Sequence, residues 1–127
     1  MLASPIAMAE PTRPDALAPT GLEISTASAA DATVLALSGE LDIASAPALE
    51  RALDEFGASI PRRVVIDLTD VTFMDSTGLR ALLLARQRTE DVDHELVLRP
   101  GPRQVQRVFE LSGTLERFSF QDRPAGA

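Results

Sequence analysis

The chain has 127 residues, which is enough for one domain with a modest hydrophobic core. It contains no Cys, which excludes disulfides, thiolate metal sites and cysteine nucleophiles, and its net charge of −7 makes nucleic acid an unfavourable partner. No apolar run approaches the ~20 residues needed to span a bilayer, and the first residues lack the basic region of a signal peptide. We therefore expect a cytoplasmic protein that binds neither nucleic acid nor a membrane.

The first part of the chain predicts a tail followed by two strands. Residues 1–20 are rich in Ala and Pro and lack periodicity, which predicts a disordered tail before a domain at 21–121. The segments Leu22–Ala27 and Thr33–Ser38 alternate loosely, as two antiparallel strands joined by a short turn would. Gly39 is expected to end the second strand.

A helix should follow, because apolar residues then recur at helical spacing. These residues are Ile43, Ala46, Leu49, Ala52, Leu53 and Phe56. Pro47 is tolerated only in a first turn, so the helix should begin near Ser45, and Gly57 should end it.

The rest of the chain alternates between strands and helices. Arg63–Leu68 is a continuous β-branched run, which predicts a central, parallel strand buried on both faces. After it we expect a helix from about Ser76 to Thr89 and a strand at Glu95–Arg99. A third helix is marked by Val105, Val108 and Phe109 and stopped by Gly113. A short strand at Phe118–Phe120 and a short tail at 122–127 should follow.

This order, β-β-α-β-α-β-α-β, predicts a single α/β domain with a mixed, mostly parallel sheet flanked by helices. In open α/β sheets, functional groups gather at the carboxyl ends of the strands. The segments Gly39–Asp42 and Asp70–Gly78 both follow predicted strands, so we expect them to share one edge.

A polar cluster, Asp75-Ser76-Thr77-Gly78, lies where the second helix should begin. If Asp75 is the N-cap, its carboxylate accepts a backbone N–H of the first turn, and Ser76 is the first helical residue with a free hydroxyl. The alternative, in which Ser76 itself is the cap, stays open from the sequence. Gly78 costs a helix about 1 kcal/mol relative to alanine, which suggests that something approaches the backbone closely there. A plain helix cap remains the simpler explanation of the cluster.

Several other residues are candidates for function. Asp42 either contacts a partner near the serine or caps the first helix, and Asp67 is interpreted as a hydrogen-bonded structural carboxylate at a strand end. Arg80, Leu84, Gln87 and Arg88 fall on one helical stripe, where an exposed Leu84 could contact a partner. His94 is not expected to be a metal ligand or a catalytic base, and we expect no cofactor or metal.

The segment Met74–Leu79, M-D-S-T-G-L, closely resembles the phosphorylation motif of bacterial anti-sigma factor antagonists, members of the STAS domain family. Three other segments are similar to that family in the same order: Leu37–Asp42, Val64–Phe73 and Val105–Phe118. The resemblance covers about Leu22 to Phe120. Members usually carry a further helix after the last strand, where this sequence has only Gln121–Ala127.

The resemblance implies a non-enzymatic regulator with a phosphorylation switch. The unmodified protein would bind an anti-sigma factor that is also a serine kinase and so free the sigma factor. Phosphorylation of Ser76 would release it, and a serine phosphatase would reset it. The implied partner contacts are Asp42, Asp75, Thr77, Gly78, Leu79, Arg80 and Leu84, although Arg80 stands where members often have a small residue. We expect a monomer or weak dimer.

Two rival functions remain. One is a STAS scaffold or transporter-associated module without the kinase cycle. The other is an enzyme with Ser76 as the nucleophile, for which the sequence offers no evident base.

Overall fold

The computed structural model describes residues 21–29 and 32–121, so the predicted tails at 1–20 and 122–127 lie outside the described residues. One sheet has the strand order β1-β2-β3-β4-β5; β1 is antiparallel to β2, and the other neighbours are parallel. The predicted α/β fold and element order are confirmed. The elements are β1 (Leu22–Ala29), β2 (Ala32–Leu41), α1 (Ala46–Asp54), β3 (Arg63–Met74), α2 (Ser76–Glu90), β4 (Glu95–Arg99), α3 (Arg103–Ser112), the 3-10 turn η1 (Leu115–Arg117) and β5 (Ser119–Phe120).

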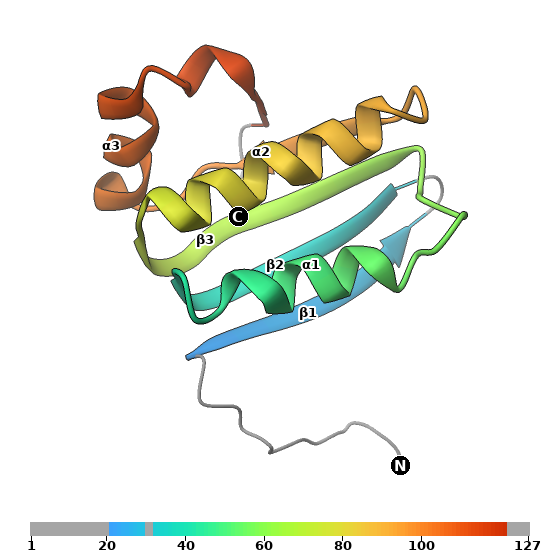
Figure 1. The fold of residues 1–127 in the computed structure, drawn as a ribbon, viewed down its shortest axis with the longest axis horizontal. Coiled ribbons are helices and arrows are strands. Elements are labelled where there is room, and N and C mark those ends of the chain that lie inside the picture. The colour runs from blue at the N-terminus through green and yellow to red at the C-terminus, as the bar shows by residue number, and fades with distance from the viewer. Residues whose placement is uncertain (1–20, 30–31, 122–127) are drawn as a thin grey trace.

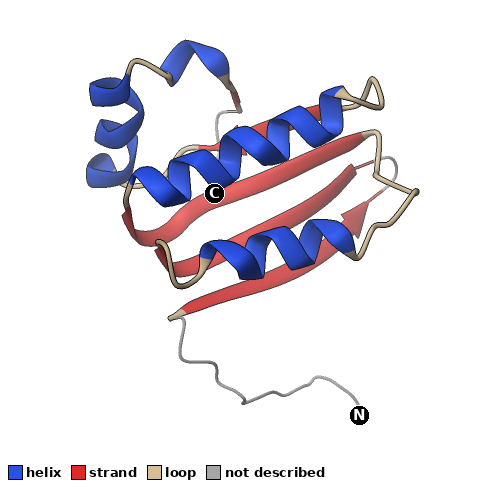
Figure 2. Cartoon of the chain, in the orientation of Figure 1, coloured by secondary structure: helices blue, strands red, loops and turns tan. Residues whose placement is uncertain are grey.

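Helices α1 and α2 lie side by side over one face of the sheet, and α3 lies near the end of the sheet where β3 runs into α2 (Figures 1 and 2). Between the helices and the strands is one hydrophobic core. Its fully buried side chains include Leu35, Leu37, Leu49, Ile66, Leu68, Leu82, Leu98 and Phe109. The Phe109 ring meets the rings of Phe118 and Phe120 edge to face, each at 5.3 Å between centroids, which joins α3 to the last strand.

The two central strands are longer than the sequence predicts. β2 continues past Gly39 to Leu41, and β3 continues past Leu68 to Met74, so the predicted ends at Gly39 and Leu68 are wrong. The extensions pair with each other across register shifts, which explains why buried residues of β3 recur every three residues instead of every two: Leu68, Val71 and Met74. The residues after the predicted strand therefore continue it and lead directly into α2.

The first helix begins at Ala46 with Pro47 in its first turn, as predicted, but it ends at Asp54, before Gly57. Ile43 lies outside the helix and is 75% exposed, so its predicted place on the buried helical stripe is wrong. It belongs instead to the turn between β2 and α1, because a helix that tolerates Pro47 cannot extend back that far.

Candidate functional site

The end of β2 and the start of α2 lie against each other at one edge of the sheet. The backbone N–H of Asp75 donates to the carbonyl of Leu41 at 3.4 Å. Figure 1 shows the same neighbourhood: the β2–α1 turn and the β3–α2 junction lie at the same end of the sheet. The prediction that these two segments share an edge is confirmed.

Asp75 is the N-cap of α2, and Ser76 is its first helical residue. Asp75 has extended backbone angles, and its Oδ1 accepts the N–H of Gly78 at 3.0 Å. The alternative in which Ser76 is the cap is therefore wrong. Ser76 is exposed, while Met74 and Leu79, at the two positions of a hydrophobic staple around the cap, are buried in the core.

Gly78 is needed for internal packing. A Cβ at this position would collide with the carbonyl oxygen of Leu41 and would lie 2.9 Å from side-chain atoms of Leu41 and Met74. The close approach inferred from the sequence is therefore that of the neighbouring strand β2. Because Gly78 is buried and Leu79 is only 6% exposed, their side-chain positions face the protein's own interior, and the partner contacts expected there are not supported.

Asp42 organises the turn before α1. Its Oδ1 accepts the N–H of Ala44 at 3.1 Å and the N–H of Ser45 at 3.1 Å. The buried Ser45 hydroxyl has one proton and two acceptors within reach, the carbonyl of Glu40 at 2.7 Å and Oδ1 of Asp42 at 3.2 Å. Asp42 therefore stabilises the turn before α1 and is not its cap, because the N-cap residue is Ser45, and these contacts fix a half-exposed carboxylate beside the start of α2.

The exposed side chains at this edge of the sheet and along the same stripe of α2 include one hydroxyl, one cation and three apolar groups. Arg80 is exposed and forms no ion pair with the described residues, Leu84 is 45% exposed, and Thr77 is half-buried. Two apolar residues were missed by sequence reasoning: Ile43, beside Asp42, and Phe73, which is 48% exposed and pairs with Glu40 across the sheet. Hereafter, the switch surface means Ile43, Phe73, Ser76, Arg80 and Leu84.

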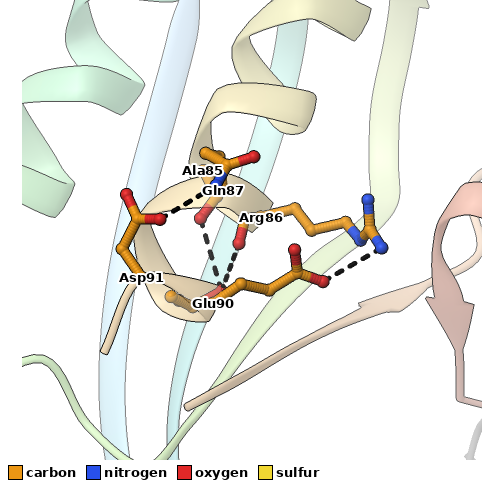
Figure 3. A network of polar contacts seen from close by, with 6 residues as sticks. Ala85, Arg86, Gln87, Glu90 and Asp91 are labelled. Carbon is orange, nitrogen blue, oxygen red and sulfur yellow. Dashed lines mark hydrogen bonds and ion pairs between the residues drawn. The ribbon is translucent and has the colours of Figure 1, made fainter. Parts of the chain in front are cut away.

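At the carboxyl end of α2, the polar side chains pair with one another and with α1. Figure 3 shows the Arg86–Glu90 ion pair, at 3.0 Å, and the hydrogen bond from Gln87 to Asp91, at 2.9 Å. Arg88 pairs with Asp54 of α1 at 2.8 Å. Two members of the predicted stripe, Gln87 and Arg88, thus already have partners within the domain.

Asp67 and His94 have structural contacts. Burial alone would raise the pKa of Asp67, but hydrogen bonds from Thr69 and the Arg99 guanidinium, at 3.3 Å, lower the pKa below its usual value. Asp67 lies within β3 and not at its end, because the strand is longer than predicted. His94 Nδ1 contacts the carbonyl of Pro61 at 3.0 Å, at the start of β4.

The described residues hold no group of three or more His, Asp or Glu side chains placed to bind a metal ion. Nor, in that part of the chain, is any helix both long and apolar enough to cross a membrane.

The family model described as the STAS domain matches residues 23–127. The chain belongs to the STAS domain family. This STAS domain is 30% identical to an anti-sigma factor antagonist of Mycobacterium paratuberculosis whose crystal structure is known; the match covers 81% of this chain and 87% of that one, with a TM-score of 0.68. The fold and family implied by the sequence resemblance are confirmed.

Two relatives extend the comparison. The STAS domain is 37% identical over 71 residues to an anti-sigma-F factor antagonist of Mycobacterium tuberculosis; the match covers 56% of this chain and 58% of that protein's length. It is 38% identical over 85 residues to BtrV of Bordetella bronchiseptica, a candidate anti-sigma factor antagonist, covering 67% and 73% of the two chains. A sulfate transporter family protein of Wolinella succinogenes shares the fold at 18% identity and a TM-score of 0.64.

Proposed function

We propose that this STAS domain is an anti-sigma factor antagonist whose binding to its partner is switched off by phosphorylation of Ser76. The observation that carries the proposal is the exposed hydroxyl of Ser76, held at the first position of a helix that Asp75 caps. The names of the relatives support the same role. We expect the domain to act in the cytoplasm.

The partner we propose is an anti-sigma factor that carries ATP and acts as a serine kinase. The Ser76 Oγ would attack the γ-phosphorus of ATP, forming an O–P bond. The bond from that phosphorus to the bridging oxygen would break, ADP would leave with the bridging oxygen, and the hydroxyl proton would pass to a base of the kinase. A serine phosphatase would hydrolyse the phosphoserine and regenerate the hydroxyl.

Binding and release follow from the chemistry of the switch surface. Ile43 and Phe73 offer exposed apolar area at the edge of the sheet where α2 begins, which suits a protein partner. A phosphate adds about −1.5 to −2 charges at neutral pH, and the free N–H groups of the α2 start would tolerate it, so the fold should survive. In a closed interface it would be an uncompensated charge, costing about 3–5 kcal/mol, or roughly two to four decades of affinity.

We infer that Ser76 is the residue that a kinase modifies, and not the catalytic nucleophile of an enzyme formed by this chain. The nearest carboxylates, Asp42 and Asp75, each use Oδ1 to accept backbone N–H groups. His94 lies at the other end of the sheet, before β4, whereas Ser76 follows β3. Among the described residues no acid or base forms a hydrogen bond with the Ser76 hydroxyl, which disfavours a catalytic nucleophile at this position.

The proposal is tested with the purified chain, its candidate kinase and ATP. Intact-mass analysis should find one added phosphate in the wild type and in Thr77→Val, and none in Ser76→Ala. In a binding titration Ser76→Ala should keep its affinity, and Ser76→Asp should weaken it at least tenfold. Ile43→Ser should also weaken binding at least tenfold without changing the unfolding midpoint.

Modification of another residue, or equal affinity of the bare and phosphorylated chains, would contradict the proposal. Capture of a membrane transporter subunit in place of a soluble ATPase would favour the transporter-associated function instead.

A further inference from the structure

Arg80 is an exposed cation one helical turn after Ser76. Both residues are exposed on α2, and Arg80 forms no ion pair with any described residue, although Asp75 and Asp42 lie near the start of the same helix. Side chains four positions apart on a helix are neighbours, about 5–6 Å apart at Cβ. The only other Arg residues of α2, Arg86 and Arg88, are already paired with Glu90 and Asp54.

We propose that Arg80 is the intramolecular counter-ion of the phosphate on Ser76. The inference rests on the proposed function, because it requires that phosphate. An acidic group four residues before a basic one is the more favourable order along a helix. A guanidinium is also well suited to phosphate, because its planar N–H groups can bind two phosphate oxygens at once.

Other charged side chains at this edge of the sheet also act on a phosphate at Ser76, and two of them oppose the effect of Arg80. Asp75 at the cap and Asp42 in the facing turn both favour the singly charged phosphate, since each repels a second negative charge. Arg103 at the start of α3 is the next cation along the edge, where Gln104 donates to the carbonyl of Thr72 at 3.4 Å. Arg80 differs from Arg103 in standing on the same rigid helix as Ser76, one turn away.

This pairing gives phosphorylation a second consequence for the switch surface. When Ser76 gains its phosphate, the guanidinium of Arg80 turns to it and is withdrawn from the partner. One modification thus changes two of the five side chains of the surface at once. It also holds the phosphate as a dianion near neutral pH, which strengthens the repulsion that releases the partner.

The test installs phosphoserine at position 76 during translation, so that it does not depend on any kinase. The phosphate is titrated by phosphorus NMR in the wild type, Arg80→Gln, Arg80→Lys and a control, Arg62→Gln. Arg62 is a matched control because it is exposed, unpaired among the described residues and placed at the other end of the sheet. The midpoint should be about 0.3 to 0.7 pH unit lower in the wild type than in Arg80→Gln.

Arg80→Lys should keep part of this shift, Arg62→Gln should keep all of it, and high salt should reduce it. Equal midpoints in the wild type and Arg80→Gln would overturn the proposal. So would a shift that is lost in Arg103→Gln but kept in Arg80→Gln. A kinase that ignores Ser76 would refute the proposed function in the mass experiment and leave this titration unchanged, so the two failures can be told apart.

Discussion

The two ends of α2 are built differently. At the carboxyl end, exposed side chains pair with one another, as in Arg86–Glu90 and Gln87–Asp91 (Figure 3). At the amino end, the contacts are a backbone hydrogen bond to β2 and the cap by Asp75. Within the described residues, the Ser76 hydroxyl forms no hydrogen bond and Arg80 forms no ion pair. The difference shows how a small domain can present side chains to a partner from a fixed position. Close packing against β2 and the cap hold the backbone at the start of α2, and the side chains of Ser76 and Arg80 are left free to contact another molecule.

The sharpest way to break this comparison is to disturb the close packing at Gly78. Gly78→Ala should lower the free energy of unfolding by about 2 kcal/mol or more, because the new methyl group meets the backbone of β2 and a backbone cannot swing aside. Urea unfolding followed by far-ultraviolet circular dichroism measures this, since the chain has no Trp to report by fluorescence.

Ser76→Ala is the matched control for Gly78→Ala, because it changes the same helical turn at an exposed position. Its unfolding free energy should stay within about 0.5 kcal/mol of the wild type. Helix propensity alone predicts the opposite result for Gly78, a gain of about 1 kcal/mol in Gly78→Ala. A gain would therefore show that β2 does not hold the start of α2.

The second prediction sharpens the comparison by removing the cap. Asp75→Ala should cost about 1 kcal/mol of unfolding free energy, since the N–H of Gly78 loses its acceptor. Asp75→Asn should cost less, because an amide oxygen can still accept that hydrogen bond. If the two variants are equally destabilised, the cap hydrogen bond is not what fixes the helix start, and the negative charge matters instead.

Sequence patterns predicted the elements well where the pattern is local. The strand at Arg63–Leu68 follows from a continuous β-branched run, and the start of α2 follows from the neighbouring residues that form the cap at Asp75. The end of β3 was missed because its register shifts against β2, and burial there recurs every three residues, which differs from the two-residue alternation of a regular strand.

The site was predicted in part for a related reason. The hydroxyl of Ser76 and the cap are local features, and the sequence identified them. Gly78 is determined by Leu41, 37 positions earlier in the chain, and no local pattern reveals that contact. Ile43 and Phe73 were missed because apolar residues are first assigned to the core, and only the folded chain distinguishes a buried side chain from one exposed beside a polar cluster.

The smallest predicted effect is at the carboxyl end of α2, where the side chains of the Arg86–Glu90 pair are 32% and 46% exposed. A double-mutant cycle with Arg86→Ala and Glu90→Ala should give a coupling of only about 0.2–0.5 kcal/mol, decreasing in high salt. Neither single variant should alter binding of the partner or phosphorylation at Ser76, because the pair lies at the far end of the helix. A coupling above about 1 kcal/mol, or a change in phosphorylation, would mean that the two ends of α2 are not independent, and that the amino end depends on more than its packing against β2.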